Sequence, residues 1–130
     1  MGKRRTVLVV CEDAALIRIL SAMSVDVVSS STVRQAKEII ARRDIQLILC
    51  DEALADGSFR DLVVASRASR KKPNVIVIFR VGEWAEYMEA LQLGAFEVVP
   101  CPLRSVDVEM AVVHGLRNNM PEPLYNEMTA

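Results

Sequence analysis

Three acidic residues directly follow apolar runs that are typical of β-strands. Glu12 and Asp13 come after the run Val7–Cys11, and Asp51 comes after the run Leu47–Cys50. Neighbouring parallel strands lie about 4.8 Å apart, so carboxylates at the ends of two of them can converge on one hard cation that prefers oxygen ligands, as Mg²⁺ does. The spacing therefore predicts a carboxylate site that could hold Mg²⁺.

A simpler role is open to each carboxylate taken singly. Acidic residues commonly cap loops, and Asp13 is well placed to accept hydrogen bonds from the first turn of a following helix. Because all three carboxylates stand at strand ends of one predicted sheet, we favour the shared site.

These residues belong to a regular alternation of strands and helices. Apolar runs predict strands at Val7–Cys11, Leu47–Cys50, Val75–Phe79 and Phe96–Val99, with a weaker edge strand at Val25–Val28. Helical spacing predicts five helices. The first covers Ala14–Met23, and the second runs from a capping box at Thr32 and Gln35 to Arg42 and Arg43. The third lies around Phe59, Leu62 and Val63, the fourth runs from Trp84 and stops at Gly94, and the fifth contains Val106, Met110 and Val113. The order predicts an α/β fold with a parallel sheet between two helical layers, whose function lies at the carboxyl ends of the strands. On the fourth helix, we expect Trp84, Tyr87 and Met88 in the core.

Composition limits the possible functions. The chain has 130 residues, with 16 Lys and Arg against 17 Asp and Glu, so it has no net charge that would attract nucleic acid or anionic lipid. It contains no apolar run of the roughly 20 residues that span a membrane. The odd set Cys11, Cys50 and Cys101 argues against a disulfide framework and predicts a reducing, cytoplasmic location. We expect one domain over residues 1–120 and a tail or linker over 121–130, after which an output domain could follow.

Enzyme classes have little support in the sequence. We find no catalytic triad, zinc motif or dinucleotide-binding fingerprint, so we do not expect a hydrolytic or redox enzyme. A flavodoxin-like enzyme or nucleotide-binding protein is an alternative of another class. Such sites need a glycine-rich phosphate loop after the first strand, whereas this chain has Cys11, Glu12 and Asp13 there.

From about Thr6 to Arg117 the chain resembles the receiver domains of two-component response regulators. The run from Val7 to Asp13 resembles the first strand with its acidic pair, and the run from Ile48 to Ser58 resembles the phosphoacceptor strand with its loop. Leu93 to Phe96 is similar to the Gly-Ala step before the last strand. The resemblance implies a doubly wound, flavodoxin-like (βα)5 fold with strand order 2-1-3-4-5.

The resemblance also implies a phosphorelay function. Asp51 would accept a phosphoryl group from a histidine kinase or phosphotransfer protein. Mg²⁺ would be held by Glu12, Asp13, Asp51 and the backbone carbonyl of Ala53, and would offset the repulsion between nucleophile and phosphoryl group. An output domain, or a second copy bound through the fourth and fifth helices, would be a further partner.

Three positions depart from the family pattern. Phe79 stands where the family has Thr or Ser, Cys101 stands in place of Lys, and Val98 replaces the aromatic switch residue. Arg80 either points to water from its strand end, which we expect, or contacts phosphate in place of the missing donors. The resemblance suggests a cis peptide bond between Cys101 and Pro102, and we expect the Cys101 thiol to be unreactive.

These departures leave a second function open within signalling. The chain could be a pseudo-receiver that never carries phosphate and acts as a protein interaction module.

Overall fold

The computed structural model describes residues 4–80 and 84–117, with the backbone only for Trp84. The tail predicted over residues 121–130 lies outside these ranges. The main strands are β1 (Arg5–Val10), β2 (Val25–Ser30), β3 (Leu47–Asp51), β6 (Asn74–Phe79) and β7 (Glu97–Pro100). The helices are α1 (Ala14–Ser21), α2 (Val33–Arg42), α3 (Phe59–Ala68), α4 (Trp84–Gln92) and α5 (Ser105–Arg117). A short hairpin of β4 (Ala53–Leu54) and β5 (Gly57–Ser58) follows β3.

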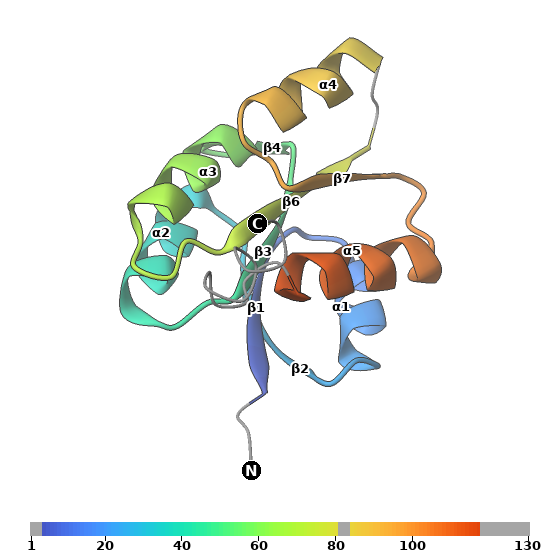
Figure 1. The fold of residues 1–130 in the computed structure, drawn as a ribbon, viewed down its shortest axis with the longest axis horizontal. Helices are drawn as coiled ribbons and strands as arrows, with labels where there is room; N and C mark the ends of the chain where they lie inside the picture. The colour runs from blue at the N-terminus through green and yellow to red at the C-terminus, as the bar shows by residue number, and fades with distance from the viewer. Residues whose placement is uncertain (1–3, 81–83, 118–130) are drawn as a thin grey trace, which may run out of the picture.

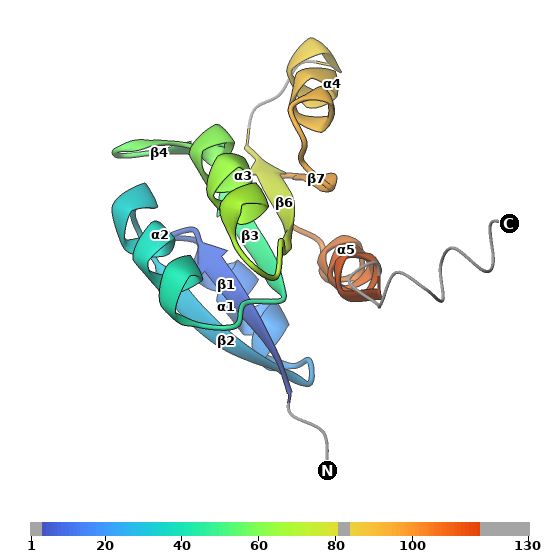
Figure 2. The same cartoon turned by 60° about the vertical axis from the view of Figure 1, so that its left-hand side comes forward.

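The five main strands form one parallel sheet in the order β2-β1-β3-β6-β7. Counted without the hairpin, this is the predicted order 2-1-3-4-5, and β2 is the predicted edge strand. Figure 1 shows α2 and α3 on one side of the sheet and α1 and α5 on the other, and Figure 2 shows the same layers from a second angle. The doubly wound α/β prediction is confirmed.

Alternation along the buried strands divides the core into two halves. In β1, Leu8 and Val10 pack toward α2 and α3, whereas Val7 and Val9 pack toward α1 and α5. All four side chains have no exposed surface. A strand covered on both faces needs apolar residues at every position, which is why these segments read as continuous apolar runs.

Helix ends follow local chemistry closely. Asp13 caps α1 as predicted, because its carboxylate accepts from the N–H of Ala15 at 2.8 Å. Helix α4 ends before Gly94, whose φ of +113° suits glycine, also as predicted. Only half of the capping box predicted for α2 forms: Thr32 accepts from the N–H of Gln35, but the Gln35 side chain accepts from the N–H of Ser31.

Several expectations about helices need correction. Helix α1 ends at Ser21 and not at Met23, because Ala22 already serves as its C-cap. Met88 is 37% exposed and is not a core residue, whereas Tyr87 packs against the core. The apolar stripe used to predict α5 faces outward, and the residues of α5 that pack on the sheet are Val108, Ala111, Val112 and Gly115.

Candidate functional site

The candidate site lies where β1, β3 and β6 end. Asp13 follows β1, Asp51 is the last residue of β3, and Arg80 directly follows β6. Asp51 is in register with Ile78, and Arg80 comes two residues after Ile78, one residue beyond the end of β6. Because side chains two residues apart in a strand share one face, Arg80 extends on the same side of the sheet as Asp51.

Arg80 bridges the two aspartates. Its Nη2 donates to Asp51 Oδ1 at 3.0 Å, and its Nη1 donates to Asp13 Oδ2 at 3.3 Å. The side chain of Asp51 is 14% exposed, whereas that of Arg80 is 45% exposed. The expectation that Arg80 points to water is therefore wrong, because two carboxylates within reach hold its guanidinium at the strand ends.

Two thiols complete the surroundings of Arg80. Its Nη2 lies 3.3 Å from Cys11 Sγ, and its Nη1 lies 4.0 Å from Cys101 Sγ. Burial raises the pKa of Cys11 to about 11, with a smaller contribution from the charge of Asp51. Partial burial lowers the pKa of Arg80, but the charge of Asp51 and the hydrogen bond to Asp13 outweigh it, so that the pKa rises above its ordinary value. The guanidinium is therefore a permanent positive charge.

Of the three predicted carboxylates, Asp13 and Asp51 converge on the guanidinium of Arg80, and Glu12 does not join them. Asp13 uses Oδ1 to cap α1 and Oδ2 to bind Arg80, so both of its oxygens are engaged. Glu12 is exposed and lines a neighbouring hollow. Within residues 4–80 and 84–117, no group of three His, Cys, Asp or Glu side chains could hold a metal ion. Although carboxylate oxygens suit Mg²⁺ chemically, this arrangement of residues does not fit the ion.

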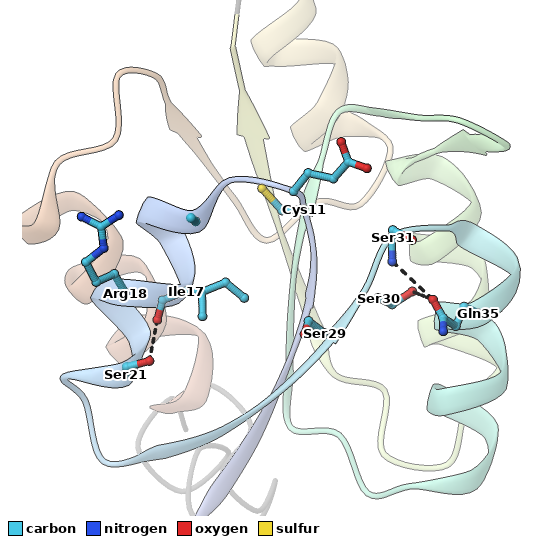
Figure 3. A pocket seen from close by; sticks show the side chains of 10 residues that line it. Cys11, Ile17, Arg18, Ser21, Ser29, Ser30, Ser31 and Gln35 are labelled. Carbon is cyan, nitrogen blue, oxygen red and sulfur yellow. Dashed lines mark hydrogen bonds between the residues drawn. The ribbon is translucent and has the colours of Figure 1, made fainter.

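The hollow of about 700 Å³ opens beside the site, between α1 and the end of β2. Figure 3 shows Cys11 at the end of β1, with Ile17, Arg18 and Ser21 on the α1 side and Gln35 on the α2 side. The remaining lining residues are Glu12, Ala14, Ser29, Ser30 and Ser31. Part of its polar lining is already paired, since Gln35 Oε1 accepts from Ser30 Oγ and from the Ser31 N–H, both at 3.4 Å.

The three positions that depart from the family pattern lie in different surroundings. Phe79 and Val98 are buried, 4% and 5% exposed, in the core half that faces α2 and α3. Cys101 is half-buried near Arg80, and its peptide bond to Pro102 is cis, as predicted. Ala53, whose carbonyl was the fourth predicted metal ligand, begins the β4–β5 hairpin and pairs with Ser58.

Sequence reasoning missed two features near the site. The two-residue period of β6 places Arg80 on the face of Asp51, but no signal in the sequence shows that its guanidinium reaches both aspartates. The other is Asp56, which accepts from the N–H groups of Val33 and Arg34 at 2.8 and 3.0 Å. Asp56 thereby caps the start of α2, although it lies 23 residues after Val33 in the sequence. No local sequence signal predicts so distant a partner.

Comparisons with known proteins agree on one family of relatives. No family model matches the chain. The response regulator protein PilR of Pseudomonas aeruginosa is 32% identical over 103 residues, which are 79% of this chain and 23% of PilR. The photosynthetic apparatus regulatory protein RegA of Rhodobacter capsulatus is 26% identical over 134 aligned positions, which cover the whole chain and 72% of RegA. The chain thus spans less than a quarter of PilR.

Solved structures show the same fold. The signal receiver domain of a LuxO repressor protein from Vibrio parahaemolyticus has a TM-score of 0.81 at 22% identity, over 98% of this chain and 99% of that one. A beryllofluoride-activated NtrC4 receiver domain dimer has a TM-score of 0.79 at 22% identity, over 88% and 98%. The receiver domain of sensor histidine kinase PA1611 from Pseudomonas aeruginosa PAO1, with a magnesium ion in its active site cleft, has a TM-score of 0.76 at 16% identity, over 88% and 98%.

The sheet order, the acidic residues at the ends of β1 and β3, and the response regulators among its relatives lead to one assignment. This chain is a response regulator receiver domain.

Proposed function

We propose that this receiver domain signals through protein contacts without taking up a phosphoryl group on Asp51. The observation that carries the proposal is the Arg80 bridge between Asp13 and Asp51. Arg80 holds Oδ1 of Asp51 in a charge-assisted hydrogen bond, so this oxygen can attack a phosphoryl group only after the pair loosens. On this proposal the domain is an interaction module and not an enzyme.

Two substitutions support the same conclusion. Cys101 brings a thiol where the family has an ammonium group that would pair with the acyl phosphate. Partial burial raises the pKa of this thiol, and the charges of Asp13 and Asp51 add to the effect, whereas Arg80 opposes it. Phe79 offers no hydroxyl, and its ring is packed in the core. A phosphoryl group on Asp51 would therefore lack both donors that normally move the adjoining loop.

The competing proposal is the phosphorelay itself. In it, Asp51 accepts a phosphoryl group from a histidine kinase with the help of Mg²⁺, and Arg80 swings from Asp13 to the phosphate oxygens. The PA1611 receiver domain with its magnesium ion is the precedent for this reading. It requires the ion to displace a guanidinium that is already hydrogen-bonded to two carboxylates, which is why we place it second.

Acetyl phosphate distinguishes the two. The wild-type chain and Asp51→Asn are incubated with acetyl phosphate and Mg²⁺, beside a receiver domain that has the full family pattern as positive control. Intact mass is then measured for a gain of about 80 Da, the mass of one phosphoryl group. We expect no gain in either form of this chain. A gain in the wild type that Asp51→Asn lacks would establish the phosphorelay and refute our proposal.

Helix α5 offers an apolar candidate for a contact surface. Val106, Met110 and Val113 are 53%, 52% and 43% exposed and follow one another at helical spacing on its outer side. We propose that this stripe binds a second copy of the chain, with the cytoplasm as the setting. The NtrC4 receiver domain is described as a dimer, which lends support to self-association.

A further inference from the structure

We infer that the guanidinium of Arg80 is a built-in counter-cation that takes the place of a divalent ion between Asp13 and Asp51. Removing it should free one oxygen on each aspartate and raise the affinity of the site for a divalent cation. The inference deepens the proposed function and rests on it in one respect: both require Arg80 to stay bound to the carboxylates in the native protein.

The first support is geometric. Of the four carboxylate oxygens on Asp13 and Asp51, two accept from Arg80, at 3.3 and 3.0 Å, and a third accepts from the N–H of Ala15 at 2.8 Å. An ion that needs several oxygens at about 2.0–2.1 Å in octahedral array would have to break the two arginine contacts first. The bridge therefore competes directly with a metal ion.

The second support is electrostatic. Two carboxylates that share one location repel each other unless a positive charge lies between them. Arg80 supplies that charge permanently, whereas Mg²⁺ would supply it only when bound. Once Arg80 has neutralised part of the negative charge, the attraction for a divalent cation falls, and binding must also release a partly buried guanidinium.

The third support comes from the two thiols beside Arg80. Its guanidinium also lies against Cys11 Sγ at 3.3 Å and Cys101 Sγ at 4.0 Å. Thiols are poor ligands for a hard ion such as Mg²⁺. The surroundings therefore suit a guanidinium, which donates to both carboxylate and sulfur atoms, better than an octahedral magnesium ion.

The experiment measures binding of metal ions alone, without any phosphodonor. Mn²⁺ is titrated into the wild type, Arg80→Ala and Arg80→Gln, with free Mn²⁺ followed by electron paramagnetic resonance, and Mg²⁺ is used as competitor. Arg60→Ala serves as the matched control, because Arg60 is an exposed arginine that pairs with Glu89 on another part of the surface. Circular dichroism confirms that each variant is folded.

We expect both Arg80 variants to bind Mn²⁺ at least about tenfold more tightly than the wild type and Arg60→Ala. Adding Asp51→Asn to Arg80→Ala should abolish the gain. Two results would overturn the inference: equal Mn²⁺ affinity in the wild type and Arg80→Ala, or a gain in Arg80→Ala that survives Asp51→Asn.

Failure of this inference and failure of the proposed function remain distinguishable. Phosphoryl uptake by the wild type refutes the proposed function whatever the metal titration gives. Unchanged metal binding in Arg80→Ala refutes the counter-cation alone, provided that the wild type still gains no mass from acetyl phosphate.

Discussion

At the scale of single residues, Arg80 governs what Asp13 and Asp51 can bind, because it holds one oxygen of each. The placement of Asp13 and Asp51 at neighbouring strand ends followed from the apolar runs before them, because strand ends are fixed by the sheet. The arginine contacts were harder to foresee, since a long side chain has many rotamers and its choice depends on partners from other strands. Strand alternation gave the side of the sheet that Arg80 faces, but not that it would reach both aspartates.

The three cysteines give a prediction at the same scale. Burial raises the pKa of all three thiols, that of Cys11 to about 11, and Cys50 is wholly buried. Only the thiolate reacts with alkylating agents, so reaction at neutral pH should be slow everywhere and should begin at the half-exposed Cys101.

Iodoacetamide labelling of the native protein, mapped by peptide mass, tests this order. The rate at Cys101 should keep rising as the pH passes 9.0, the ordinary value for a thiol. Labelling of Cys11 or Cys50 ahead of Cys101, or a rate at Cys101 that levels off below pH 9, would contradict the prediction.

At the scale of elements, helix positions were predictable and helix faces only partly so. The stripe Leu16 and Leu20 of α1 is buried as its spacing predicts, because α1 has one apolar side. Helix α5 has apolar residues on two sides, and spacing alone cannot say which side meets the sheet. The side with the small residues Ala111 and Gly115 packs inward, where a Cβ on Gly115 would run into the side chain of Leu47.

The start of α2 is the element most dependent on a distant residue. Asp56 accepts hydrogen bonds from the N–H groups of Val33 and Arg34, which lower its pKa from the ordinary 3.8. A carboxyl group with a lowered pKa in the folded state stabilises the protein above pH 3.8. That contribution is lost as the pH falls through the lower, folded value.

Asp56→Ala should therefore unfold at a lower urea concentration than the wild type at pH 7. The difference should shrink as the pH falls from 3.8 through the lower pKa of the folded state, because the wild-type carboxylate is then protonated and no longer caps α2 as an anion. Asp44→Ala is the control, because it removes the same charge from an exposed position in the loop before β3. Equal loss of stability in the two variants at pH 7 would show that charge alone, and not the cap, is responsible.

At the scale of the whole molecule, the fold and the chemistry of the site were set by different parts of the sequence. The order of five strands and five helices could be predicted from the spacing of apolar residues and from the signals at helix ends. Errors of a few residues in the predicted boundaries did not alter the topology. The site lies where the ends of β1, β3 and β6 meet. Arg80, at the end of β6, therefore changes what Asp13 and Asp51 can bind. Among the described residues, no helix is long and apolar enough to cross a membrane.

The outer side of α5 yields the last prediction, that the domain associates with itself through this helix. An exposed apolar stripe of Val106, Met110 and Val113 loses contact with water when two copies pair, which is favourable in proportion to the apolar area removed. We expect the wild type to show a mass in analytical ultracentrifugation that rises with concentration toward that of a dimer. Met110→Glu places a charge in the centre of the stripe and should weaken this association at least about tenfold. Val64→Glu is the matched control, since Val64 is 68% exposed on α3 and lies on another helix. A wild type that stays monomeric at all concentrations, or equal weakening by the two substitutions, would remove α5 as the contact surface between copies.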